Sequence, residues 1–306
     1  MTVQTQLQAN SLKQYFILCR PRQWIKNFFL FAPLVFSKHL LDGDFARTEF
    51  LAFVVFCLLS SAVYVLNDLA DRESDRLHPV KRMRPIASGA IGFWQGAFFG
   101  IFLLILAGLL AWGLDPRFQL AAGIYFLLNI AYSFWLKRIL LVDVFVIAAG
   151  FMLRVLAGAY AIDVVVSHWL VLCTLFVSVF LAVSKRRAEI MLRPVNDQVT
   201  TRAVLKEYDV AFIDQMMTVA ASGMTIAYAL YTVADRTISM FGTENLIFST
   251  VFVLFGTFRY LHLVRKYGSE DNPTNMIVSD PVMITNVAAW FVTCVLIIYW
   301  PTLFGA

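Results

Sequence analysis

Nine consecutive residues, 67 to 75, carry the side chains with the clearest chemical use in this chain of 306 residues. They read Asn-Asp-Leu-Ala-Asp-Arg-Glu-Ser-Asp and follow directly on a long apolar run. Asp68, Asp71 and Asp75 are spaced by three and four residues, which places their carboxylates on one face of a helix. Three like charges this close repel one another unless a cation lies among them, and hard oxygen ligands suit Mg²⁺. The spacing predicts a Mg²⁺ site formed by these three carboxylates beside Asn67.

Basic residues follow the acidic stretch within a few positions. Lys81, Arg82 and Arg84 lie in the same polar segment, and Lys and Arg bind phosphate through charge-assisted hydrogen bonds. Carboxylates that can hold a metal, followed by cations that can hold phosphate, predict a site for a Mg²⁺-bound phosphorylated substrate.

The composition places these residues in a membrane protein. Hydrophobic residues make up 60% of the chain, charged residues only 15%, and the mean hydropathy is +0.72. A soluble domain carries about a quarter charged residues, and a spanning helix needs about 20 apolar ones. The fold class predicted is an all-α polytopic membrane protein with about nine transmembrane helices, over residues 25–41, 47–66, 91–113, 118–136, 140–162, 168–184, 209–234, 244–264 and 282–300.

No linker or low-complexity segment divides these spans, so residues 25–306 are predicted to form one domain. Two long polar loops, 67–90 and 185–208, interrupt the apolar sequence. Residues 1–24 precede the first span and contain a predicted interfacial amphipathic helix that is N-capped by Ser11 and ends at Pro21.

Lysine and arginine residues favour one side of the membrane. With nine spans, 19 of the 25 lie in loops on the side of the N-terminus and of both long loops, and four lie on the other side. The positive-inside rule places the richer side in the cytoplasm. We therefore expect a multi-pass protein of the cell (inner) membrane with a cytoplasmic N-terminus and a cytoplasmic site.

Two basic residues lie within or near the predicted spans. Arg154 is in the middle of its span, where an Arg costs at least ~2.5 kcal/mol on insertion scales, so it should face a cavity and an anion or form an ion pair with another helix. Lys26 lies one turn into the first span and could either reach a cavity or extend to the interface. Gly92, Gly96 and Gly100 allow close helix contact, within the protein or in a homo-oligomer.

The stretch 67–75 matches the Asn-Asp-x-x-Asp-x-x-x-Asp signature, and on it the chain resembles the UbiA superfamily of intramembrane prenyltransferases. Tyr132 and Lys137 after the fourth predicted span, and a second motif after the sixth, extend the resemblance over nearly the whole chain. It implies a helical bundle around a lipid-open central cavity, with Mg²⁺ and a diphosphate at the cytoplasmic mouth.

The second motif departs from that of the aromatic-prenylating members. Where they carry an acidic element, this chain reads Lys185-Arg186-Arg187-Ala188-Glu189, which suits a further phosphate group better than a further Mg²⁺. With residues 20–27, residues 78–89 and the pair Tyr208-Asp209, this motif resembles the decaprenyl-phosphate phosphoribosyltransferase branch of the superfamily.

That resemblance implies transfer of a 5-phosphoribosyl group from phosphoribosyl diphosphate (PRPP) to a polyprenyl phosphate, with release of diphosphate. The product would feed the synthesis of cell-envelope polysaccharide such as arabinogalactan. Asn67, Asp68, Asp71 and Asp75 would be the catalytic residues, the three aspartates as Mg²⁺ ligands. The candidate substrate-binding residues are Arg22, Lys26, Lys81, Arg82, Arg84, Tyr132, Lys137, Arg154, Lys185, Arg186, Glu189 and Tyr208.

Two alternatives stay open at this point. An aromatic prenyltransferase that makes quinone or haem precursors shares the fold and the first motif, but the basic second motif argues against it. A secondary transporter also has intramembrane Arg and Gly-rich spans, but its sites lie near the midplane, whereas the ionisable groups of this chain lie mainly in loops. We expect no nucleic-acid partner.

Overall fold

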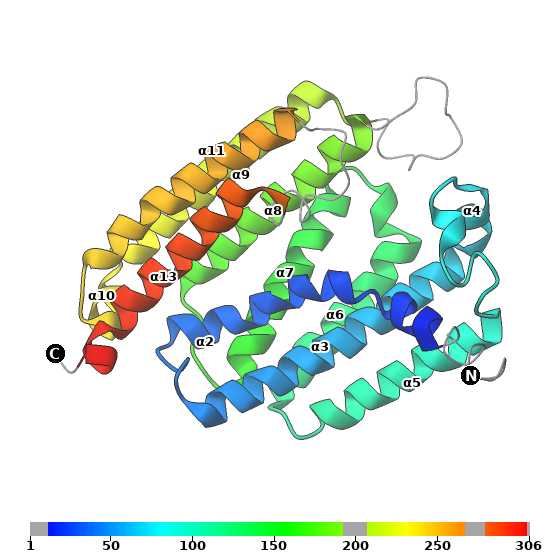
Figure 1. Cartoon of the computed structure of the whole chain (residues 1–306), viewed down its shortest axis with the longest axis horizontal. Coiled ribbons are helices and arrows are strands. Elements are labelled where there is room, and N and C mark those ends of the chain that lie inside the picture. The colour runs from blue at the N-terminus through cyan, green and yellow to red at the C-terminus, as the bar shows by residue number, and fades with distance from the viewer. Residues whose placement is uncertain (1–11, 192–206, 267–278, 305–306) are drawn as a thin grey trace. The chain divides into compact units, whose positions relative to one another are not determined.

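The structure, a computed structural model, describes residues 12–191, 207–266 and 279–304, and within these ranges it contains helices and no strands (Figure 1). Two compact units form. Unit 1 comprises residues 1–34, 42–134 and 153–164, and unit 2 comprises residues 35–41, 135–152 and 165–306. Residues 67–75 belong to unit 1 and residues 185–189 to unit 2, so each unit carries one of the two motifs. The predicted single domain remains a prediction.

The helices of unit 1 follow closely on one another. A helix over residues 12–19 precedes the 3₁₀ helix η1, and long helices follow. The elements are η1 (Pro21–Phe31), α3 (Gly43–Ala70), α4 (Arg72–Leu77), η2 (Lys81–Met83), α5 (Phe93–Ala111) and α6 (Pro116–Phe134). Helix α7 (Val142–Ala161) contributes its second half to this unit, and α2 (Ala32–Phe36) contributes its first residues.

Unit 2 holds the rest of α2 and α7 and the C-terminal helices. Helices α8 and α9 pack side by side, and so do α11 and α13 (Figure 1). The elements are η3 (Leu136–Arg138), α8 (His168–Met191), α9 (Val210–Thr232), α10 (Asp235–Phe241), η5 (Asn245–Ser249), α11 (Thr250–Lys266) and α13 (Pro281–Phe304).

The predicted spans correspond to these helices. Among the described residues, seven helices are long and apolar enough to cross a membrane. The other two predicted spans, 118–136 and 25–41, correspond to α6 and to η1 with α2. The first of these nine spans is not one α-helix, because it begins as a 3₁₀ helix and changes to α-helix just before Pro33, a residue that the first turn of an α-helix tolerates.

The predicted interfacial helix is observed over residues 12–19 and ends before Pro21 as expected. Its predicted N-cap, Ser11, and most of the predicted loop 185–208 lie outside the described residues. The described start of that loop, 185–191, is the last part of α8 rather than loop. The side chains of Leu12 and Phe16 are exposed while Leu18 is buried, which fits a helix that lies along a surface.

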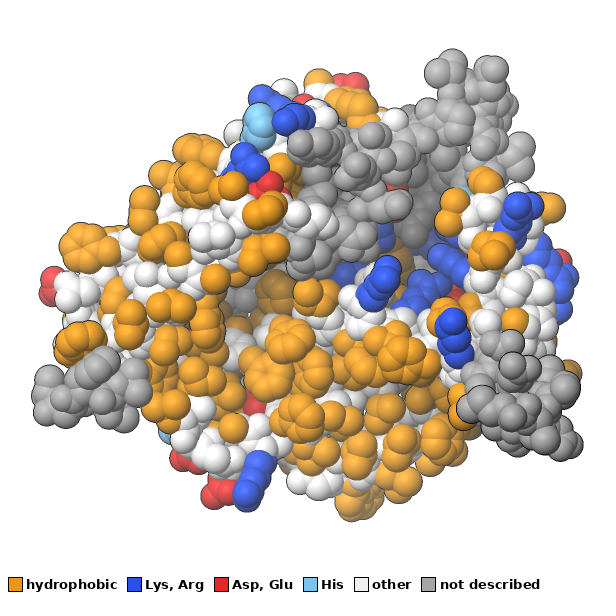
Figure 2. Space-filling view, viewed as in Figure 1, with side chains coloured by type: hydrophobic (Ala, Val, Ile, Leu, Met, Phe, Trp, Pro, Cys, Tyr) orange, Lys and Arg blue, Asp and Glu red, His pale blue; other side chains and the backbone are white. Residues whose placement is uncertain are grey.

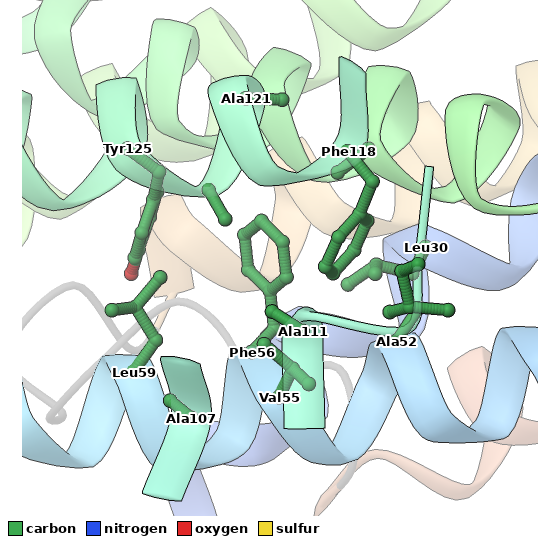
Figure 3. Close-up of a cluster of buried hydrophobic side chains, with 13 residues drawn as sticks. Leu30, Ala52, Val55, Phe56, Leu59, Ala107, Ala111, Phe118, Ala121 and Tyr125 are labelled. Atoms are coloured by element: carbon green, nitrogen blue, oxygen red, sulfur yellow. The ribbon is translucent and has the colours of Figure 1, made fainter. Parts of the chain in front are cut away.

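Helix α3 is the central element of unit 1. Asp42 caps its N-terminus, where its carboxylate accepts from the backbone N–H groups of Asp44 (3.0 Å) and Phe45 (3.5 Å). Figure 3 shows its buried face, where Phe56 lies between side chains of α5 and α6, with ring centroids 5.8 Å from Phe118 and 5.2 Å from Tyr125. This packing fixes the middle of α3, the helix whose C-terminal end carries the acidic stretch.

Two of the three glycines predicted to allow close helix contact, Gly96 and Gly100, pack against other parts of unit 1. A Cβ on Gly100 would lie 3.2 Å from Val65 of α3, and one on Gly96 would lie 3.1 Å from Ile86 and 3.4 Å from Leu69. The sequence left open whether these glycines pack within the protein or in a homo-oligomer, and packing within the chain is observed at Gly96 and Gly100.

A closer approach occurs at Gly158 of α7. A Cβ there would overlap the backbone oxygen of Leu30 and lie 2.6 Å from Oε1 of Glu49, so its neighbours would have to shift. We expect Gly158→Ala to lower the free energy of unfolding by about 2 kcal/mol or more, because η1 must move away from α7. Thermal unfolding of the purified protein in detergent measures this change.

Gly108→Ala in α5 is the matched control, because a Cβ at Gly108 meets nothing within 4 Å. That substitution should leave stability unchanged or raise it slightly, since Ala favours the helix. Equal unfolding temperatures for the two variants would contradict the close packing of η1 on α7.

Candidate active site

The acidic stretch lies where α3 ends and α4 begins. Asp71 separates the two helices with φ −92° and ψ 7°, yet backbone hydrogen bonds from Asp71 to Asn67 (2.9 Å) and from Asp75 to Asp71 (2.8 Å) keep helical spacing through the junction. The carboxylates of Asp68 and Asp75 therefore still lie on one side, as the spacing predicted. Both are almost fully buried, with 2% and 3% of their surface exposed.

Two arginines hold these buried carboxylates. Nη1 of Arg84 lies 3.2 Å from Oδ1 of Asp68 and 2.5 Å from Oδ2 of Asp75, so one guanidinium bridges both. Arg20 also pairs with Asp68, and its guanidinium lies over the ring of Tyr64 at 4.9 Å. Buried carboxylates require such partners, because burying an isolated charge costs several kcal/mol.

The three predicted metal ligands do not form a ready metal site. Among the described residues, no three His, Cys, Asp or Glu side chains come together closely enough to hold a metal ion. Asp68 and Asp75 nevertheless converge on one cationic nitrogen, so two hard oxygen ligands are within reach of a single cation, which fits Mg²⁺ in chemistry and number. Asp71 lies half-buried at the junction.

The basic residues of the first loop are accessible. Lys81 and Arg82 lie exposed in η2, whose first residues are held by hydrogen bonds from the N–H groups of Val80 (3.2 Å) and Lys81 (3.3 Å) to Nδ1 of His78. In Figure 2, Lys and Arg side chains gather over the region of α4, while hydrophobic side chains are frequent over α3 and α5 of the same unit. Exposed cations thus lie in the same loop as Arg84, which pairs with both carboxylates.

Asn67 faces α6 rather than the carboxylates. Its side-chain oxygen accepts a hydrogen bond from the hydroxyl of Ser133, which also bonds to the backbone of Asn129 at 2.7 Å. Tyr132, a predicted substrate-binding residue, is the neighbour of Ser133 on α6 and is half-buried. Asn67 therefore connects the acidic stretch to α6.

Arg154 is buried in unit 1 and bonds to side chains of two other elements. Its Nε donates to Oδ1 of Asn27 (2.8 Å), its Nη2 donates to the hydroxyl of Tyr125 (2.8 Å), and its guanidinium lies 4.6 Å from the Tyr125 ring centroid. Lys26, half-buried, directly precedes Asn27 in η1, and Arg22 lies exposed one turn earlier.

The second motif has a different use in unit 2. Arg186 is fully buried, forming an ion pair at 2.6 Å between its Nε and Oδ2 of Asp143, although the angle there does not satisfy a hydrogen bond. Its Nη1 also lies 2.5 Å from Oε2 of Glu189. Arg187 donates to Asp214 (2.7 Å) and to the backbone oxygen of Val264 (3.1 Å). Both arginines thus connect elements of the protein, whereas the sequence suggested that the motif contacts phosphate.

Tyr208 completes this network. Its hydroxyl donates to Oδ1 of Asp143 (2.8 Å) and accepts from the backbone N–H of Leu141 (3.0 Å). Burial, together with the hydrogen bond to the Asp143 carboxylate, raises the pKa of Tyr208 above its usual range, so the hydroxyl stays protonated and continues to donate. Lys137 in η3 and Lys185 in α8, also predicted to bind substrate, are half-buried.

The predicted site residues therefore divide between the units. Unit 1 brings together Asp68, Asp75 and Arg84, with Lys81 and Arg82 in the same loop. Unit 2 brings together Arg186, Glu189 and Tyr208. Arg20 and Asp143 were not among the predicted site residues. A signal for Arg20 was its position among the basic residues of the N-terminal segment, and a signal for Asp143 was its charge at the start of an apolar helix.

Sequence comparison assigns the family. A sequence profile of the UbiA prenyltransferase family matches residues 30–279. The chain belongs to the UbiA prenyltransferase family. Decaprenyl-phosphate phosphoribosyltransferase of Mycolicibacterium smegmatis is 35% identical over 69% of this chain and 68% of its own length. The enzyme of the same name from Corynebacterium glutamicum is 31% identical over 92% of this chain and 85% of its own length.

A solved structure shares the UbiA fold. The UbiA homologue of Archaeoglobus fulgidus bound to GPP and Mg²⁺ is similar with a TM-score of 0.69 and 17% identity, over 93% of this chain and 99% of that one. The chain is thus a multi-pass membrane transferase of the UbiA type, and the expected all-helical UbiA fold is confirmed.

The buried Arg186–Asp143 pair generates a stability prediction. Asp143→Asn should lower the free energy of unfolding by about 3 kcal/mol, because breaking one partner of a buried pair leaves a charge without compensation. Thermal unfolding of the purified protein in detergent measures the change. Arg47→Gln, which removes the exposed ion pair with Asp44 (3.7 Å), should leave the unfolding temperature unchanged. An equal change in unfolding temperature for the two substitutions would contradict the prediction that the buried Arg186–Asp143 pair contributes more to stability than an exposed pair.

Proposed function

We propose that this UbiA-family protein is a Mg²⁺-dependent transferase that moves a 5-phosphoribosyl group from phosphoribosyl diphosphate to a polyprenyl phosphate and releases diphosphate. Relatives that carry the name decaprenyl-phosphate phosphoribosyltransferase match this chain over most of its length, and this observation carries the proposal. The product would be a lipid-linked precursor for cell-envelope polysaccharide. The positive-inside pattern supports a cytoplasmic site in the inner membrane.

The carboxylates of Asp68 and Asp75, with Asp71 at the junction, are the groups that would hold Mg²⁺. Their convergence on one nitrogen of Arg84 supports a shared cation there. When bound, Mg²⁺ would neutralise the negative charge that develops on the departing diphosphate. Asn67, which bonds to Ser133, would keep the end of α3 in position during this step.

The cationic side chains of unit 1 would bind the phosphate groups of the two substrates. Lys81, Arg82 and Arg84 are placed in the loop that follows the carboxylates and suit the phosphates of the ribose donor. Arg22 and Lys26, in η1, suit the headgroup of the polyprenyl phosphate. The buried Arg154 donates a hydrogen bond to Asn27, the residue that follows Lys26. Its charge would add positive potential for the headgroup phosphate.

In the transfer itself, the bond between ribose C1 and the diphosphate oxygen breaks and a bond from C1 to an oxygen of the lipid phosphate forms. The departing pair of electrons leaves with diphosphate, and C1 passes through an oxocarbenium-like state, as in glycoside cleavage. The attacking phosphate is already an anion at neutral pH, so it needs little help from a general base. The protein's part is therefore to orient two anionic substrates and offset their charge.

In unit 2, Lys137 and Lys185 are the candidates for phosphate contact. The network of Arg186, Glu189 and Tyr208 would support the end of α8 that carries Lys185. In this proposal the two lysines bind phosphate, and the buried Arg186 positions the helix end that carries Lys185.

Purified protein in detergent or nanodiscs, supplied with PRPP, a polyprenyl phosphate and Mg²⁺, should form phosphoribosylated lipid and release diphosphate. Mass spectrometry of the lipid and a diphosphate assay measure the two products. Parallel reactions offer an aromatic acid with a prenyl diphosphate. Prenylation of the aromatic acid without transfer from PRPP would contradict the proposal and favour the aromatic branch of the family.

Asp68→Asn should reduce this transfer by about 10²-fold or more, because the charge that develops on the leaving group loses its main compensation. Asp115→Asn is the control, since Asp115 also lies at a helix end in unit 1 but pairs with Arg117 (2.9 Å), away from the acidic stretch. Initial rates at saturating substrate measure both. Full activity of Asp68→Asn, in a variant that elutes and unfolds like the parent, would remove Asp68 from the site.

A further inference from the structure

Arg20 occupies a backbone conformation that costs free energy. Its φ of 52° and ψ of 59° are left-handed, a region that side chains other than Gly and Asn adopt rarely. Residue 20 follows the helix over 12–19 and precedes Pro21, a position where a helix end commonly carries glycine. An arginine at such a position indicates that its side chain makes a contact that offsets this cost.

The chain on both sides of Arg20 is attached to one face of α3, through a backbone oxygen before it and a tryptophan side chain after it. The hydroxyl of Ser61 donates to the backbone oxygen of Cys19 at 2.9 Å and accepts from Nε1 of Trp24 at 3.1 Å. Tyr64, under the Arg20 guanidinium, and Asp68, its ion-pair partner, follow Ser61 at three and seven residues along the same helix. The left-handed turn thus directs Arg20 along α3 to the buried carboxylate.

Asp68 is therefore held by two guanidinium groups, that of Arg20, which precedes the acidic stretch in the sequence, and that of Arg84, which follows it. Both arginines keep part of their surface in contact with solvent, 26% for Arg20 and 28% for Arg84, whereas Asp68 keeps 2%. A divalent cation that bridges these oxygens of Asp68 and Asp75 would take the place of Nη1 of Arg84, which lies 3.2 Å from Oδ1 of Asp68 and 2.5 Å from Oδ2 of Asp75. Such a bridging cation therefore requires Arg84 to move, and it competes with Arg20 for Oδ1 of Asp68. The solvent-facing side of both guanidinium groups leaves them a direction in which to move.

We propose that Arg20 and Arg84 are exchangeable partners of the carboxylate pair. Without a divalent cation they neutralise Asp68 and Asp75, and when a cation binds there, the two guanidinium groups transfer to the phosphate groups that the cation carries. The exchange keeps the buried carboxylates compensated in both states and delivers two phosphate ligands at the moment when phosphate arrives. Arg20 thereby becomes a further binding residue. This inference rests on the proposed role of Asp68 and Asp75 as cation ligands.

The exchange predicts opposite effects on cation and phosphate binding when either arginine is removed. In the full-length protein without donor, Arg20→Gly and Arg84→Gln should bind Mn²⁺ about tenfold more tightly than the parent, because a competing charge-assisted bond is lost. In the presence of saturating Mn²⁺, the same variants should bind inorganic diphosphate about tenfold more weakly. Electron paramagnetic resonance of free Mn²⁺ and isothermal titration calorimetry measure the two affinities.

Glycine relieves the strained backbone at position 20, so Arg20→Gly removes the guanidinium without adding strain; Arg20→Asn, which tolerates the same conformation, replaces it if the glycine variant does not fold. Arg117→Gln is the charge-matched control, because Nη2 of Arg117 also bridges two carboxylates, Asp115 (2.9 Å) and Asp163 (2.7 Å). It should leave both affinities at the site unchanged. An equal rise in Mn²⁺ affinity for Arg117→Gln would reduce the effect to overall charge and overturn the exchange.

Asp68→Asn separates this inference from the proposed function. Unchanged Mn²⁺ binding in that variant would refute the cation site and the exchange together. Loss of Mn²⁺ binding in Asp68→Asn, with parent-like or weaker Mn²⁺ binding in both arginine variants, would overturn the exchange alone.

Discussion

Two carboxylates buried at one helix end need positive charge, and unit 1 is arranged to supply it. Asp68 and Asp75 are nearly inaccessible to solvent, and ionised groups in such a place are stable only beside cations. One cation comes from the segment before η1 and the other from the loop after η2. Segments far apart in the chain are thus brought to the end of α3 by a single electrostatic requirement.

A second polar contact holds η1 deeper in the unit. The side-chain amide of Asn27 accepts from Arg154 of α7 (2.8 Å) and donates to Ser60 of α3 (3.3 Å), so one amide connects three elements. Such bonds are favourable among apolar helices, where packing against lipid offers little to distinguish one neighbour from another. Together with the contacts of Ser61, they attach η1 to α3 along its length. The basic residues Arg22 and Lys26 are positioned by these contacts.

The sequence predicted the parts that depend on local patterns. The spacing of Asp68, Asp71 and Asp75, the apolar runs and the helix end before Pro21 follow from helix periodicity and proline geometry, which act within a few residues. The partners of the carboxylates could not be predicted in this way. Arg20 reaches Asp68 across 48 positions, and its contact depends on the left-handed turn at residue 20 and on how η1 packs against α3. Such a long-range contact leaves no periodic signal in a single sequence.

The second motif shows why the charge of a motif does not decide its role. Lys185, Arg186 and Arg187 read as a phosphate-binding run because all three are cationic, but two of them are used within unit 2. Arg186 lies between Asp143 and Glu189, and Arg187 bonds to Asp214, so both positive charges are already compensated by carboxylates. A buried arginine paired in this way cannot turn to a substrate without leaving a carboxylate uncompensated. The two arginines therefore fix the end of α8 to α7 and α9, and under the proposed function phosphate contact would fall to Lys185.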